Sequence, residues 1–137
     1  MDNNLRLLIV DDDPDDREFF IEAIKDVDET IECITASNGI QALEWLRDTG
    51  HPLPDLIFLD ISMPLLNGRN CLAEIKKDQR LLTIPVIIYT TSKDIDESRE
   101  LKKMGALHFM TKPRDAEEIY YPVAVVLEEY LFSARNK

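Results

Sequence analysis

The sequence lacks the features that would direct it to a membrane or to an oxidising compartment. No apolar run approaches the roughly 20 residues that a membrane-spanning helix requires. The opening Met-Asp-Asn-Asn does not have the basic and then apolar layout of a signal peptide. Only two cysteines occur, Cys33 and Cys71, without metal-ligand spacing, so we expect two reduced, buried thiols. These absences predict a cytoplasmic protein.

Basic residues are also scarce, at 16 against 27 acidic residues, which gives a net charge of −11. Such a surface repels nucleic-acid phosphates and anionic lipid, so we expect neither nucleic-acid nor membrane binding. It favours metal ions or protein partners with basic patches. There is no internal repeat, low-complexity segment or linker, and 137 residues correspond to a single domain spanning 1–137.

Short apolar runs alternate along the chain with longer amphipathic stretches. The predicted strands are Leu5–Val10, Ile31–Thr35, Leu56–Leu59, Pro85–Thr90 and Ala106–Met110. A helical pattern follows each strand. The helices are predicted to begin at Asp13-Pro14 and at Ser37-Asn38-Gly39, to cover Asn67–Asp78 and Asp94–Lys103, and to end near Ala134.

Strands that are apolar on both faces belong inside a parallel sheet that helices cover on both sides. Crossovers between parallel strands are right-handed, so few topologies remain. We therefore predict an α/β fold with a doubly wound, five-stranded parallel sheet of order 2-1-3-4-5, a flavodoxin-like (βα)5 arrangement. Its ligand crevice is expected at the carboxyl ends of strands 1 and 3.

The second helix and the last helix have features that the sequence predicts in more detail. Helical spacing predicts that Ile40, Leu43 and Leu46 face the core from the second helix. Pro122 falls in the last helical pattern, where proline removes a backbone donor. Either Asp115–Tyr121 is a separate turn and Pro122 begins the helix, or the helix is kinked there.

Polar residues follow four of the predicted strands and converge on one edge of the sheet. Asp11 and Asp12 end strand 1, Asp60 ends strand 3, Thr90 ends strand 4 and Lys112 follows strand 5. Close carboxylates repel one another unless a cation lies among them, and Mg²⁺ accepts such oxygen ligands. The lysine ammonium and the threonine hydroxyl can both donate to phosphoryl oxygens.

This set of residues suits phosphoryl transfer, which needs a nucleophile, a metal ion and donors for the transferred charge. A carboxylate can act as the nucleophile and become a mixed anhydride. The sequence offers no residue suited to completing a substrate turnover. It therefore favours an acceptor that stores phosphate over a conventional enzyme.

At these residues the sequence resembles the response-regulator receiver family of two-component signalling, in its single-domain, chemotaxis-type form. The resemblance covers essentially the whole chain. The matching segments are Leu8–Asp12, Asn38-Gly39 with Ala42-Leu43, Asp55–Asp60, Met63-Pro64 with Asn67-Gly68, Ile84–Thr90, Gly105-Ala106 and Lys112-Pro113. Each segment alone is weak, but their order and spacing together are specific.

The resemblance implies a phospho-acceptor and a magnesium site. Asp60 corresponds to the phospho-accepting aspartate, which also contacts Mg²⁺. Asp12 would bind Mg²⁺ directly, Asp11 would bind it through water, and the Ser62 backbone carbonyl would be a further ligand.

The resemblance also implies a switch. Thr90 would be the switch hydroxyl, Lys112 would contact the phosphoryl group, and Phe109 would rotate inward when Thr90 moves toward the phosphate. The Lys112-Pro113 bond is expected to be cis. One departure from the family pattern is Thr91, which stands where a very small residue is common and would narrow access to the phosphoryl group.

The family implies a histidine kinase or histidine phosphotransfer protein as donor. A downstream target protein would bind the face of the fourth helix, fifth strand and fifth helix, about Ile95 to Leu131. We expect a monomer or weak dimer without an output domain. The alternative is a phosphorylation-independent binding module of the same fold. An aspartyl phosphatase is disfavoured by Ser62, where such enzymes carry a second acid, and a flavin carrier is disfavoured by the acidic triplet at Asp11.

Overall fold

The computed structural model describes residues 5–61, 67–91 and 94–132, except for the side chains of 116, 117, 131 and 132. Its elements are β1 Arg6–Val10, α1 Pro14–Val27, β2 Glu32–Ala36, α2 Gly39–Arg47, β3 Leu56–Asp60, α3 Gly68–Lys77, β4 Val86–Thr90, α4 Ile95–Lys103, β5 His108–Thr111, the 3₁₀ turn η1 Ala116–Ile119, α5 Tyr120–Val126 and the π-helical η2 Leu127–Phe132. The strands form a parallel sheet of order β2-β1-β3-β4-β5, which confirms the predicted doubly wound fold. None of the described helices is long and apolar enough to span a bilayer.

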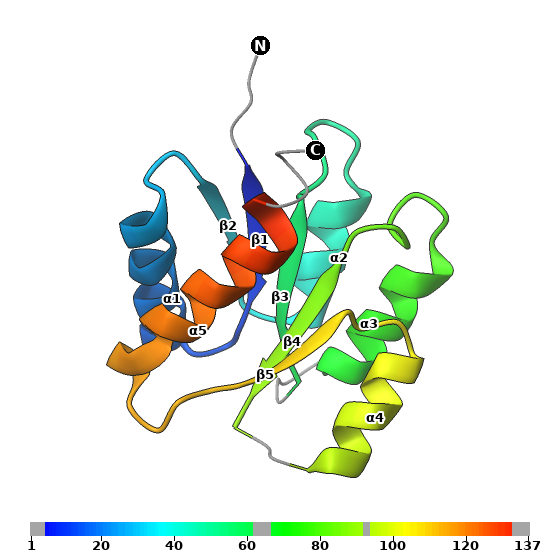
Figure 1. Cartoon of the computed structure of the whole chain (residues 1–137). Coiled ribbons are helices and arrows are strands. Elements are labelled where there is room, and N and C mark those ends of the chain that lie inside the picture. The colour runs from blue at the N-terminus through cyan, green and yellow to red at the C-terminus, as the bar shows by residue number, and fades with distance from the viewer. Residues whose placement is uncertain (1–4, 62–66, 92–93, 133–137) are drawn as a thin grey trace.

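Helices cover both faces of the sheet. α1 and α5 lie on one face, and α2, α3 and α4 lie on the other (Figure 1). Alternate residues of β1 divide between the two cores, since Leu7 and Ile9 pack beneath α1 and α5 while Leu8 and Val10 pack on the opposite side. All five residues of β3 and of β4 are buried, as expected for central strands of a parallel sheet.

Helix α1 begins directly after the acidic end of β1 because of a cap and a proline. The Asp13 side chain accepts hydrogen bonds from the backbone N–H groups of Asp15 and Asp16, at 2.9 and 3.3 Å. Pro14 occupies the first helical position, where its missing N–H has no intrahelical partner. The cap holds the start of α1 against the carboxyl edge of the sheet, so residues of the first helical turn come close to Asp11.

Several boundaries differ from the sequence prediction. β5 begins at His108 and not at Ala106, because the Ala106 N–H donates to Leu101 O at 3.0 Å and closes the end of α4. Gly105 makes this turn possible with a φ of 116°, which side chains rarely tolerate. The prediction for Ile40 was wrong, since its side chain is 45% exposed. The buried face of α2 is Gly39, Ala42, Leu43 and Leu46, which follows the 3.6-residue helical repeat.

The structure decides between the two alternatives for Pro122. A separate 3₁₀ turn, Ala116–Ile119, precedes α5, which agrees with the first alternative, but that alternative is wrong about the helix start, because α5 begins at Tyr120 and not at Pro122. Pro122 is therefore the third helical residue. The first four N–H groups of a helix have no intrahelical acceptor, so proline removes no hydrogen bond at this position.

Both cysteines are free. Cys71 is buried, as expected, whereas Cys33 is only partly buried. Burial raises the pKa of the Cys71 thiol to about 12, which keeps it protonated and unreactive at neutral pH.

Candidate functional site

Strand alternation places four side chains together at the carboxyl edge of the sheet. Ile9, Phe58, Ile87 and Met110, from β1, β3, β4 and β5, belong to the core beneath α1 and α5. Side chains two positions apart in a strand share a face. Asp11, Asp60, Tyr89 and Lys112 follow at that spacing, so they lie on the α1 side of the sheet where the strands end.

Three carboxylates meet at this edge. One oxygen from each of Asp11, Asp12 and Asp60 lies within 4.8 Å of the others; Asp11 and Asp60 are buried and Asp12 is exposed. Like charges this close repel one another unless a cation lies among them. Since carboxylate oxygens are the ligands that hard divalent cations prefer, the cluster fits a divalent metal site.

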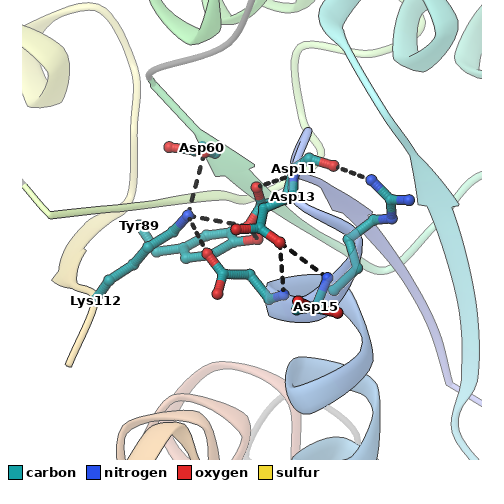
Figure 2. A network of polar contacts seen from close by, with 8 residues as sticks. Asp11, Asp13, Asp15, Asp60, Tyr89 and Lys112 are labelled. Atoms are coloured by element: carbon teal, nitrogen blue, oxygen red, sulfur yellow. Dashed lines mark hydrogen bonds and ion pairs between the residues drawn. The ribbon is translucent and has the colours of Figure 1, made fainter. Parts of the chain in front are cut away.

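The Lys112 ammonium forms ion pairs with two carboxylates of this cluster and with one carboxylate of α1. Its Nζ lies 3.0 Å from Asp11 Oδ2 and 3.2 Å from Oδ2 of both Asp16 and Asp60 (Figure 2). Burial alone would lower the pKa of Lys112, but the charge of Asp60 and the hydrogen bond to Asp11 outweigh it and raise the pKa above its ordinary value. A permanent cation is thus held within reach of Asp60.

Protein donors hold both the carboxylate and the backbone carbonyl of Asp11. Its Oδ1 accepts from the Asp13 N–H at 3.0 Å, and its Oδ2 accepts from the Tyr89 hydroxyl at 2.7 Å (Figure 2). The Arg17 guanidinium donates to the Asp11 backbone carbonyl at 2.6 Å. Burial, reinforced by the charge of Asp11, raises the pKa of Tyr89 well above its ordinary value, so the phenol is a donor at neutral pH.

Thr90 and Phe109 lie on the opposite face of the sheet from Tyr89. Ile88, two residues before Thr90, belongs to the core beneath α2, α3 and α4, and Phe109 is partly buried against that same core. The β4–β5 register pairs Ile88 with Phe109, so Thr90 and Phe109 are near neighbours on adjacent strands. Thr90 is 1% exposed, and its carbonyl accepts from the Lys112 N–H at 2.6 Å.

Three further expectations have different outcomes. Ser62 lies outside the described residues. Thr91 is exposed at the end of β4. The described residues contain no cis peptide bond, so the expectation that the Lys112–Pro113 bond is cis was wrong. The trans isomer before proline is favoured by about 0.5–1 kcal/mol, and with it Lys112 still reaches Asp60.

Sequence reasoning missed Asp16, Arg17 and Tyr89. Asp16 and Arg17 lie in the first turns of α1, and the cap at Asp13 was the feature that could have placed them beside the site. Tyr89 reads as one more apolar strand residue. Its polar tip and its position next to Thr90 were the features that could have distinguished it.

The sequence matches the response regulator receiver domain over residues 7–124. The response regulator Rcp1 of Synechocystis sp. is 31% identical over 118 residues, covering 83% of this chain and 80% of that protein. Protein PilH of Pseudomonas aeruginosa is 32% identical over 122 residues, covering 89% of this chain and 97% of PilH.

Solved structures agree with these matches. The phosphorylated cyanobacterial phytochrome response regulator RcpA superposes with a TM-score of 0.89 at 28% identity, covering 95% of this chain and 96% of that chain. The Mn²⁺-bound form of Rcp1 gives a TM-score of 0.84 at 30% identity, covering 93% and 94%. Since the receiver-domain match covers most of the sequence, the chain belongs to the response regulator receiver domain family of two-component signalling.

Proposed function

We propose that this chain is a cytoplasmic phospho-acceptor switch, phosphorylated on Asp60 by a histidine kinase or histidine phosphotransfer protein. In this proposal it is a stand-alone receiver that catalyses only its own phosphorylation and dephosphorylation. The observation that carries it is the enclosed position of Asp60, 4% exposed, between the carboxylates of Asp11 and Asp12 and the ammonium of Lys112. RcpA, a structural relative, is known in a phosphorylated form.

The transfer proceeds by attack of an Asp60 carboxylate oxygen on the donor's phosphorus. The new O–P bond makes a mixed anhydride while the donor leaves with the electron pair of its own bond to phosphorus. Lys112 Nζ lies 3.2 Å from Asp60 Oδ2. After the transfer it would exchange this contact for an ion pair with a phosphoryl oxygen. The Thr90 hydroxyl, at the end of the neighbouring strand, would be the second donor.

Mg²⁺ is the proposed metal. Asp12 and Asp60 would hold it directly, Asp11 would hold it through water, and the Ser62 carbonyl would be a further ligand. A bound divalent ion supplies positive charge to the phosphoryl oxygens as negative charge develops on them. Asp12 is the exposed acid of the cluster and would be the one most accessible to an ion from solvent. Rcp1, which is similar to this chain, is known in a Mn²⁺-bound form.

The output is proposed to be a contact with a target protein through the α4–β5–α5 face, by a monomer or weak dimer. Thr90 would move toward the phosphoryl group and Phe109 would then turn inward from β5. The shared face of these two residues on adjacent strands supports this coupling. Large apolar side chains on α4 and α5 are exposed and available to a partner, namely Ile95, Tyr121 and Val125, at 66%, 77% and 56%.

The test is to incubate the purified protein with acetyl phosphate, with and without Mg²⁺, and to measure its intact mass. We expect one added phosphoryl group that requires Mg²⁺ and is absent in Asp60→Asn. Asp26→Asn removes an exposed acid of α1 and should be labelled like the natural sequence. Labelling that persists in Asp60→Asn would contradict the assignment. A chain that binds Mg²⁺ but is never labelled would instead be the phosphorylation-independent binding module.

A further inference from the structure

Tyr89 is a buried polar residue to which the proposed phosphoryl transfer assigns no part. It is 1% exposed and immediately precedes Thr90 in β4. Its ring centroid lies 4.9 Å from that of Phe20 in α1 and 6.4 Å from that of Phe58 in β3. These neighbouring rings restrict the phenol, so its hydroxyl occupies a defined place at the edge of the sheet.

The Tyr89 hydroxyl reaches across β3 to Asp11. Strand β3 separates β4 from β1, and Tyr89 pairs with Asp60 in the β3–β4 register. The side chain nevertheless donates to Asp11 Oδ2 at 2.7 Å (Figure 2). Its ring also lies beneath Lys112, with Nζ 4.9 Å from the centroid. One residue therefore contacts the acid at the end of β1 and the lysine after β5.

The donors around Asp11 leave it limited capacity for anything else. A carboxylate has about four lone-pair sites. Asp11 accepts from Asp13 N–H, from Tyr89 O–H and from Lys112 Nζ, and its side chain is fully buried. Among the contacts of the described residues, about one site remains, which leaves room for one further partner, either a metal ion or a metal-bound water. The orientation of that site depends on the donors that fix the carboxylate.

We propose that Tyr89 is a positioning residue for Asp11, and that its hydroxyl thereby sets the affinity of the acidic cluster for a divalent cation. This inference rests on the metal site of the proposed function. Without the hydroxyl, Lys112 is the one remaining donor to Asp11 Oδ2 among the described residues, and the carboxylate can turn away from the repelling oxygens of Asp12 and Asp60. Groups that orient metal ligands typically change affinity by 10- to 100-fold.

A purely structural role makes a different prediction. If the Tyr89 hydroxyl only satisfies its own hydrogen-bonding need in the core, its removal changes stability and leaves metal affinity unchanged. If it positions Asp11, the effect on metal affinity must depend on the Asp11 carboxylate. A double-mutant cycle between the two residues separates these readings.

The experiment titrates Mg²⁺ alone into the unphosphorylated protein by calorimetry. Tyr89→Phe keeps the ring and removes the hydroxyl, and we expect Mg²⁺ to bind it roughly 10-fold more weakly or worse. Tyr121→Phe makes the same chemical change at a side chain that is 77% exposed, and should leave the affinity unchanged. In an Asp11→Asn background, adding Tyr89→Phe should cause little further loss. Tyr89→Met, which also lacks a hydroxyl, replaces Tyr89→Phe with the same expectations if the latter does not fold.

Two results would overturn the inference alone: unchanged Mg²⁺ affinity in Tyr89→Phe, or an equal loss with and without the Asp11 carboxylate. Failure of the natural sequence to bind Mg²⁺ at all would overturn the metal site of the proposed function, and this inference with it. The two failures are therefore distinguishable in one set of titrations.

Discussion

At the scale of single residues, the site is a balance between the carboxylates of Asp11, Asp12, Asp16 and Asp60 and the ammonium of Lys112. Lys112 contacts three of these acids and is only 12% exposed. Breaking a buried ion pair by removing one partner typically costs about 3–5 kcal/mol, because a buried charge is left uncompensated. The metal-free protein therefore depends on Lys112 for stability as well as for its proposed chemistry.

The first prediction concerns the pH dependence of this stabilisation. The pKa of Lys112 is raised in the folded protein above its ordinary 10.5. A raised folded pKa contributes stability that is complete below pH 10.5 and is lost as pH rises through the folded pKa. Lys112→Met should thus lower the free energy of unfolding by about 3 kcal/mol at pH 8, and this difference should shrink in strongly alkaline solution.

Urea unfolding of the metal-free protein at a series of pH values measures this difference. Lys102→Met, at an exposed position of α4, is the control and should remain close to the natural sequence throughout. A difference for Lys112→Met that stays constant beyond pH 11 would mean that charge is not the reason for its destabilisation.

The second prediction concerns Asp12. It is exposed, and its carboxylate lies within 4.8 Å of those of Asp11 and Asp60. Asp12→Asn removes a repulsion and also a proposed Mg²⁺ ligand. It should raise the free energy of unfolding of the metal-free protein by on the order of 1 kcal/mol, the Coulomb energy of such a pair in water. It should also weaken Mg²⁺ binding.

Thermal unfolding without metal and calorimetric titration with Mg²⁺ measure the two effects of Asp12→Asn. Asp26→Asn, elsewhere on the exposed side of α1, should change neither quantity. The opposite signs of the two effects are the diagnostic result, since a simple loss of structure would lower both stability and affinity.

The residues of the site differ in how far the sequence could identify them. Asp11, Asp60 and Lys112 follow apolar strands, and the alternation of strands and helices is enough to bring such positions to one edge. Asp16 and Tyr89 are different. The contact of Asp16 with Lys112 depends on the angle at which α1 leaves the sheet. The hydrogen bond from Tyr89 to Asp11 depends on a side chain long enough to cross the whole of β3.

At the scale of elements, the start of α3 lies directly against the backbone at the end of β3. A Cβ atom on Gly68 would lie 2.3 Å from Asp60 O and 2.5 Å from Ile61 Cα, and both are backbone atoms that cannot move aside cheaply. The Gly68 N–H also donates to Ile61 O at 3.0 Å. The glycine therefore allows α3 to hold the end of β3, and with it Asp60, in place.

The third prediction follows from this close approach. Gly68→Ala should lower the free energy of unfolding by about 1–3 kcal/mol, the usual cost of overpacking. It should also slow the proposed phosphorylation of Asp60, because the backbone that carries Asp60 must shift. Gly50→Ala is a matched control, since among the described residues its Cβ would meet a side chain, that of Asp48 at 3.2 Å, and no backbone atom. Chemical unfolding and the rate of labelling by acetyl phosphate are the measurements. Equal rates and stabilities for the two variants would show that α3 does not position Asp60.

Element boundaries show where sequence reasoning stops. The cap at Asp13 and the central strands were predictable, because side-chain hydrogen bonding and continuous apolar runs are local properties. The start of β5 and the course of the chain around Pro122 were not. The start of β5 depends on a hydrogen bond across the turn after α4. The course around Pro122 depends on which residue begins α5, and several starting residues satisfy the same local sequence pattern.

At the scale of the whole molecule, the site joins parts of the chain that are far apart in sequence. Asp11 follows β1, Asp60 ends β3, Thr90 ends β4 and Lys112 follows β5. Asp16 of α1 forms an ion pair with the Lys112 ammonium. The strands that carry these residues contribute to both cores. A ligand that binds at this edge therefore contacts elements from across the sheet, and we expect it to stabilise the domain as one cooperative unit.

The final prediction uses this linkage. A ligand that binds only the folded state stabilises it by RT ln(1 + [L]/Kd), about 2.7 kcal/mol at a hundredfold excess over Kd. For a domain of this size that corresponds to roughly 10 °C in Tm. Mg²⁺ should raise the Tm, and Mg²⁺ with beryllofluoride, a stable mimic of the phosphoryl group, should raise it further. Asp60→Asn should lose the increment from beryllofluoride, because in the proposed function that adduct forms on the Asp60 carboxylate, whereas Asp26→Asn should keep it. An increment that survives in Asp60→Asn would place the bound mimic elsewhere and remove Asp60 from the centre of the proposed switch.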